Sequence, residues 1–268
     1  MNSPPPKNPR TVFFEYYNKN IKSLGIKSPA YHFKGRREKQ DVVNVISAEV
    51  NREDISRLSK EYGLSVTELI TAVYIYALYN VQQKTRNRRP IRIAVPVNLR
   101  YVFPSQTMRN FTNFIICGIT PQTGKYSFND IASEVHHSMR RGLIKNNLLR
   151  SFSGNVNSER NIFVRILPLK LKLLILSLIY FYKGENQYSG SFSNLGIIKF
   201  PDDMQKFVKD FKCYLSPNTV NTTNCGATCF NDKLNITFTR TIKESLIERE
   251  FFRFFVKNKI NVKIRSGV

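Results

Sequence analysis

The sequence has 268 residues, and 41% of them are hydrophobic, so it encodes a folded globular protein and not a disordered chain. Its formal net charge of +23 favours an anionic partner such as nucleic acid, a membrane surface or phosphate groups. The longest apolar run, Leu171 to Tyr182, is shorter than the ~20 residues of a membrane span, so we expect no transmembrane segment.

Residues 1–40 are predicted to be a linker or an extended segment, because four prolines among the first ten residues disfavour regular structure. Residues 41–268 are predicted to form one domain. It opens with a strand at 42–50, which is rich in β-branched residues.

Two helices are expected next. A short helix capped by Asn51 or Asp54 follows the first strand. Ser65 and Glu68 then form a capping box, in which each side chain binds a backbone N–H of the other residue. The apolar spacing that follows predicts a long helix to about Thr85.

The rest of the domain alternates strands and helices. In order, we expect strands at 91–97 and 114–119, a helix at 127–141, a helical stretch at 145–182, strands at 188–194 and 207–215, a β-hairpin of 224–230 and 234–240, a helix at 243–257 and a strand at 260–264. This succession predicts an α/β fold with a mixed β-sheet and helices packed on it.

The central stretch, residues 91–115, reads IRIAVPVNLRYVFPSQTMRNFTNFI. Asn98 and Arg100 follow the first of its strands, and Asn113 precedes the second apolar run. Polar side chains at strand ends over a rigid sheet are common site positions. A plain surface loop between two strands explains the same pattern equally well.

Histidine is scarce, and His136-His137 is the pair with a catalytic pattern. It superficially matches H-H-x-x-x-D-G, in which the second histidine is a general base, so His137 is a weak catalytic candidate. However, Arg141 stands at the aspartate position, and the pair is predicted to lie in mid-helix. Two helix-surface histidines are therefore the favoured interpretation.

No metal-binding or nucleotide-binding pattern is found. Cys225 and Cys229 lie on one predicted strand with no histidine near them, which argues against zinc. The four cysteines form no C-x-x-C pair and the N-terminus resembles no signal peptide, so we expect a cytoplasmic protein with reduced thiols. The basic residues are scattered over nearly every element, which argues against a nucleic-acid partner.

Three motifs together resemble one family. They are PVNLRYVFPSQTMRNFTNF in the central stretch, SFSNLGIIKFP at 191–201, and the hairpin with the REFFRFFVK helix. This set resembles the bacterial alcohol acetyltransferase-like proteins of the CoA-dependent acyltransferase superfamily. That superfamily includes chloramphenicol acetyltransferase and the condensation domains of nonribosomal peptide synthetases.

The resemblance implies a two-lobed fold of which this chain resembles only the C-terminal lobe. In that family the catalytic H-H-x-x-x-D-G motif lies in the N-terminal lobe, and an arginine similar to Arg100 pairs with its aspartate. Ser193, Asn194 and Gly196 resemble a segment near the substrate channel, with a tight turn as the alternative.

Two functions follow as expectations. The first is a half-protein related to acyltransferases, with acetyl-CoA or acyl-CoA as donor and an alcohol or amine as acceptor. It would be inactive alone, and would need an N-terminal half in trans or self-associate through its uncovered face. The second is a non-catalytic basic module that binds CoA phosphates, nucleic acid or anionic lipid. No bound cofactor is expected.

Overall fold

In the computed structural model of the chain, the residues described are 13, 16, 28–105, 108, 110–121, 124–160, 168–179 and 184–267, without the side chains of 154–160, 176 and 179. They form a seven-stranded sheet in the order β3-β2-β4-β5-β6-β1-β7. Its strands are β1 (Asn44–Asn51), β2 (Ile91–Asn98), β3 (Thr112–Ile119), β4 (Gly190–Ile197), β5 (Thr223–Phe230), β6 (Lys233–Arg240) and β7 (Val262–Ser266). The α/β class and the mixed sheet are confirmed.

Two parallel pairings hold the middle of the sheet together. β4 pairs in parallel with both β2 and β5, while the remaining neighbours pair antiparallel. The contact between β2 and β4 is short, because it joins only Ile93 to Gly190 and Ala94 to Ser191. The sheet therefore has a weakly joined seam at this point.

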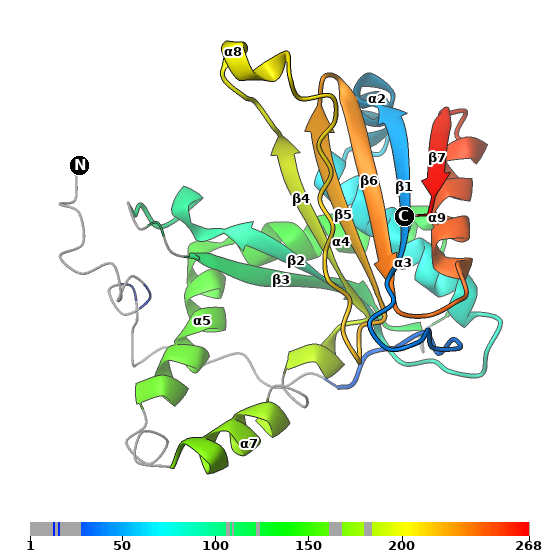
Figure 1. The fold of residues 1–268 in the computed structure, drawn as a ribbon. Coiled ribbons are helices and arrows are strands. Elements are labelled where there is room, and N and C mark those ends of the chain that lie inside the picture. Colours follow the sequence, from blue (N-terminus) through cyan, green and yellow to red (C-terminus); the bar gives the residue numbers. More distant parts are fainter. Residues whose placement is uncertain are drawn as a thin grey trace.

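Helices cover one face of the sheet (Figure 1). They are α2 (Arg52–Glu61), α3 (Val66–Gln82), α4 (Phe128–Leu143) and α9 (Leu246–Lys257). The central helix, α3, is buried on almost every side, and the Tyr74 hydroxyl donates to the carbonyl of Thr223 on β5 at 2.8 Å. Helices α5 (Lys145–Arg160) and α7 (Leu169–Ile179) extend away from this layer.

The local signals at helix starts are confirmed. Asn51 accepts a hydrogen bond from the Glu53 N–H at 2.7 Å as the cap of α2. The predicted capping box of Ser65 with Glu68 is formed before α3, and a second one, of Ser127 with Asp130, is formed before α4. These side chains satisfy backbone N–H groups that the first helical turn leaves without partners.

The predicted hairpin is β5 and β6. Its two turn residues, Asn231 and Asp232, have φ angles of 47° and 57°, as a type I′ turn requires. Leu234, Ile236 and Phe238 face the helices. The opposite face carries Asn235, Thr237 and Thr239.

The strand predicted at 207–215 is wrong. This segment instead lies as an extended strap, residues 210–216, across the polar face of β5 and β6. Sheet side chains bind its carbonyls: Thr228 Oγ1 donates to Phe211 O at 2.9 Å, Thr237 to Cys213 O, and Thr239 to Leu215 O. The side chains of the strap alternate as they do in a strand, but its backbone carbonyls accept hydrogen bonds from side chains of the sheet.

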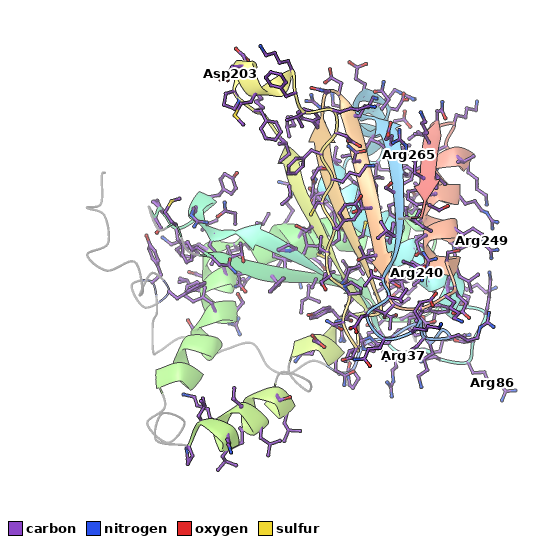
Figure 2. The ribbon with its side chains drawn as sticks, viewed as in Figure 1. Arg37, Arg86, Asp203, Arg240, Arg249 and Arg265 are labelled. Carbon is purple, nitrogen blue, oxygen red and sulfur yellow. The ribbon has the colours of Figure 1, made fainter. Side chains whose placement is uncertain are left out.

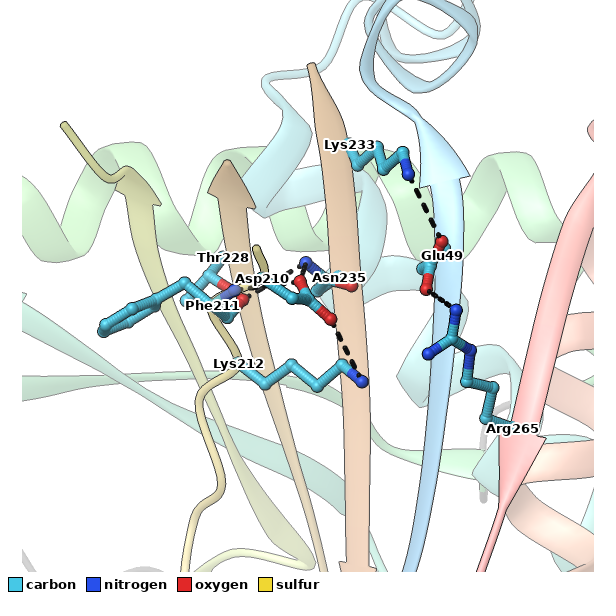
Figure 3. A network of polar contacts seen from close by, with 8 residues as sticks. All are labelled: Glu49, Asp210, Phe211, Lys212, Thr228, Lys233, Asn235 and Arg265. Carbon is cyan, nitrogen blue, oxygen red and sulfur yellow. Dashed lines mark hydrogen bonds and ion pairs between the residues drawn. The ribbon is translucent and has the colours of Figure 1, made fainter. Parts of the chain in front are cut away.

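The strap also carries its own ion pair (Figure 3). Asp210 accepts from Asn235 Nδ2 at 2.8 Å and pairs with Lys212 Nζ at 3.2 Å. The backbone approach is close, because a Cβ on Gly226 would lie 2.3 Å from the carbonyl oxygen of Cys213. On the neighbouring strand, Glu49 pairs with Arg265 at 2.8 Å.

Other predicted boundaries needed smaller corrections. The helix expected at 243–257 begins at Leu246, and the last strand runs over Val262–Ser266. The stretch 145–182 contains α5 and α7, while residues 161–167 and 180–182 lie outside the described residues. No single helix among the described residues is long and apolar enough to cross a bilayer, although α2 and α3, bent by 79°, pass that test as a pair.

Candidate functional site

The candidate site lies where β2 and β4 separate. Beyond their short parallel contact, β2 continues with β3, and β4 continues with β5 (Figure 1). The sheet therefore divides into two arms. Asn98, Arg100 and Asn113 lie on the β2–β3 arm, and Ser193, Asn194 and Gly196 lie on the β4 arm.

On the β2–β3 arm, Asn98 organises the strand end. Its Oδ1 accepts from the Arg100 backbone N–H at 3.1 Å and from Arg100 Nη1 at 3.3 Å, which caps the 3₁₀ turn η1 (Leu99–Tyr101). Asn113 donates to Ser151 Oγ on α5 and accepts from the Phe114 N–H. The half-buried Arg100 guanidinium is thus held at the strand end.

A second small core supports this arm. Leu99, Phe103 and Phe111 from the arm pack against Leu148 and Phe152 of α5. The rings of Phe13 and Tyr16, from the predicted linker, pack against the same cluster. The arm therefore has its own apolar support, separate from the main core.

On the β4 arm, Asn194 joins the strand to the helical layer. Its Nδ2 donates to Thr67 Oγ1 on α3 at 3.0 Å, and its Oδ1 accepts from the Gly196 N–H at 2.9 Å. Gly196 has a φ of 74°, a value that costs other residues strain. The turn expected at Ser193–Gly196 is instead a bulge inside β4, which continues to Ile197.

Large apolar side chains are exposed on both arms. The β2–β3 arm exposes Tyr101 and Phe114, and the β4 arm exposes Leu195 and Ile197. Exposed apolar residues that gather near polar ones are typical of a surface that binds another protein or a ligand. Both arms of the divided sheet therefore expose apolar side chains beside polar ones.

The histidine pair lies on α4, among the helices. His137 is exposed, and the His136 Nδ1 atom lies 3.2 Å from the Glu68 Oε1 atom. Arg140 Nε lies 3.6 Å from the same buried carboxylate, so Glu68 links the start of α3 to α4. The capping-box pattern identified Glu68 in the sequence. The pairing of Glu68 with His136 depends on the packing of α4 against α3.

The third histidine, His32, lies elsewhere. Burial lowers the pKa of this half-buried imidazole. The segment around it is docked, because Tyr31 N–H donates to the carbonyl of Pro90 at 2.7 Å. No histidine among the described residues belongs to either arm.

The cysteines have the environment of structural residues. Cys117, Cys213, Cys225 and Cys229 are free thiols. Burial raises the pKa of Cys225 well above its ordinary value, which opposes reactivity. Within the described part of the chain, no three His, Cys, Asp or Glu side chains are grouped to hold a metal ion.

The positive charge is spread over the molecule. Figure 2 shows Arg37, Arg86, Arg249 and Arg265 on four different segments, while Arg240 is buried beside Glu248. Charge distributed in this way does not mark either arm as a phosphate site.

Comparisons with known proteins identify the fold. No protein-family model and no curated protein sequence matches the chain. The crystal structure of the epimerization domain from the third module of tyrocidine synthetase B matches with a TM-score of 0.50 and 13% identity, over 92% of this chain and 55% of that chain. The chain has the fold of half such a domain.

A second solved structure has a similar fold over part of its length. The nonribosomal peptide synthetase FmoA3, bound to α-methyl-L-serine-AMP, matches with a TM-score of 0.54 and 13% identity, over 86% of this chain and 24% of that chain. The chain thus spans about half or less of these proteins. The predicted α/β fold with a mixed sheet is confirmed, and its arrangement is that of about half of the epimerization domain.

Proposed function

We propose that this chain is one lobe of an acyltransferase-related protein, and that acyl transfer requires a second lobe that carries the catalytic histidine. The observation that carries the proposal is the divided sheet: a half-domain fold whose two arms expose polar strand ends and large apolar side chains. The second lobe would belong to a separate chain or to the same polypeptide.

The proposed reaction moves an acyl group from a CoA thioester to an alcohol or amine. The histidine of the second lobe takes the proton from the acceptor as the acceptor attacks the thioester carbonyl. The new ester or amide bond forms, the C–S bond breaks, and CoA leaves as the thiol with the returned proton. No further cofactor is needed for this chemistry.

Arg100 is the residue proposed to join the lobes. A guanidinium and a carboxylate can form two parallel charge-assisted hydrogen bonds, which fix orientation as well as distance. The side chain of Asn98 holds Arg100 at the end of β2, where an aspartate of a second lobe could reach it. Arg100 would then position the catalytic loop without contacting substrate.

The remaining candidates would line the channel. We propose that Ser193, Asn194 and Gly196 form one wall, and that Asn98 and Asn113 form the other. The bulge at Asn194 supports this role, because bulges redirect side chains beside binding sites.

The proposed organisation is a linker or extended entry segment of residues 1–40, docked on the lobe around Tyr31, followed by the lobe of residues 41–268. Four free thiols support a reducing compartment, so we propose the cytoplasm.

Binding between the two lobes tests this proposal. The chain should form a one-to-one complex with an N-terminal lobe that carries an H-H-x-x-x-D-G motif, measured by calorimetry. Arg100→Ala should weaken binding at least tenfold and Arg100→Lys by less, since lysine keeps the charge but loses the bidentate geometry. Arg249→Ala, an exposed change on α9, is the matched control. Equal binding by all three variants, or no complex, would refute the proposal.

A further inference from the structure

Helix α7 exposes leucines on opposite sides. Leu171, Leu174 and Leu178 share one side of the helix and are 45%, 59% and 52% exposed. Leu169 and Leu173 lie on the other side and are 71% and 57% exposed. A helix that is apolar all round normally lies in a protein core or in lipid. Figure 1 shows α7 away from the sheet and its covering helices.

The charges near α7 in the sequence are mostly positive. Arg160, Arg165, Lys170, Lys172 and Lys183 lie in the helix or within nine residues of it, whereas the acidic residue in that span, Glu185, is buried. Two of these lysines, Lys170 and Lys172, lie within the first turn of the helix. A surface that is apolar and carries negative charge therefore complements α7 best.

We propose that α7 binds the surface of a bilayer that contains anionic lipids. Its 11 residues have a length of about 16 Å, whereas the hydrocarbon core of a bilayer is about 30 Å thick. The helix would lie in the interface, with Leu171, Leu174 and Leu178 facing the acyl chains. The stems of Lys170 and Lys172 are long enough to reach the phosphates of the headgroups.

Charge favours an anionic bilayer over the other surfaces that could cover α7. A second copy of the chain in parallel would bring a second pair of the same lysines against the first, which opposes that pairing, and an antiparallel copy would offer the lysines no negative charge from its α7. The second lobe of the proposed function is expected at the two arms of the sheet, and these belong to other elements. An anionic bilayer satisfies both the apolar surface and the cations.

Vesicle co-sedimentation of the full chain tests this. Vesicles of 70% phosphatidylcholine and 30% phosphatidylserine should bind the chain at least tenfold more tightly than pure phosphatidylcholine vesicles. High salt should weaken that binding by screening the lysines. Leu174→Asp should lower the affinity at least tenfold, and Lys170→Glu with Lys172→Glu should do so as well. Val256→Asp, at a residue 59% exposed on α9, should leave binding unchanged.

Two results would overturn the proposal. One is binding to neither vesicle, or binding that the α7 variants do not change while circular dichroism shows them folded. The other is concentration-dependent self-association that Leu174→Asp abolishes, which would assign α7 to contact between copies. The assay needs neither acyl transfer nor a second lobe, so its failure would not affect the proposed function.

Discussion

Asn194 donates from its Nδ2 atom to the Oγ1 atom of Thr67 at 3.0 Å, and so connects the bulge of β4 to the first turn of α3. The Oδ1 atom of the same amide accepts from the N–H of Gly196. Both polar atoms of the Asn194 side-chain amide are thus hydrogen-bonded. Its first role is to fix the shape of the β4 arm.

Replacing Asn194 by alanine removes both hydrogen bonds, so the free energy of unfolding should fall by about 1–2 kcal/mol. Urea denaturation measures this. Ser193→Ala, next to it on β4, should change the stability by less than about 0.5 kcal/mol. If Asn194→Ala is as stable as Ser193→Ala, the amide does not hold the arm.

The buried pair of Arg240 and Glu248 joins β6 to α9. Their charged atoms lie 2.9 Å apart, and the two side chains are 10% and 2% exposed. Glu248→Ala leaves a buried guanidinium without its carboxylate and should cost about 3–5 kcal/mol in urea denaturation. Replacing both residues, Arg240→Met with Glu248→Leu, should recover most of that loss. A double variant less stable than Glu248→Ala would show that packing, and not the unpaired charge, sets the cost.

The capping box of α4 predicts a pH dependence. The side chain and the backbone N–H of Ser127 hold the pKa of Asp130 below its usual 3.8. A pKa lowered in the folded state stabilises the protein above the unfolded value, and this contribution is lost as the pH falls through the folded value. Asp130→Asn should therefore be less stable than the natural chain at pH 7, and the difference should shrink as the pH falls through the lowered pKa of Asp130. A difference in urea midpoint that is constant with pH would contradict this.

The strap across β5 and β6 can be tested through its cysteine. Thr237 Oγ1 binds the carbonyl of Cys213, and burial raises the pKa of that thiol. Thr237→Val removes the donor with little change in shape, so the strap should loosen and a thiol reagent should label Cys213 several-fold faster. Thr237→Ser keeps the hydroxyl and should label at the natural rate. Equal labelling of both variants would mean that this bond does not hold the strap.

Local patterns predicted much of the fold. Capping boxes, the type I′ hairpin and the alternation of β6 depend on neighbours in the sequence, and all three are present. The strap was mistaken for a strand because an extended segment has the same alternation whether its carbonyls bind a strand or threonine side chains. The threonines on β6 were visible, but their partners lie about 24 residues away in sequence.

The arrangement of the candidate site depended on pairing that no local pattern encodes. The polar residues around the end of β2 were found from the strand-end pattern, and those within β4 from the resemblance of their segment to a known family. Their placement on separate arms follows from the short contact between β2 and β4, a tertiary feature. Likewise, the histidine pair was predicted to be helical, but the contact of His136 with Glu68 required the packing of α4 on α3.

Release of the CoA thiol from acetyl-CoA, with an alcohol or amine acceptor, tests the central claim most directly. The chain alone should release no thiol above the buffer rate. Addition of the histidine-bearing lobe should start release, and replacing the second histidine of that lobe's motif by alanine should stop it. Release by this chain alone that disappears in His137→Ala would contradict the account.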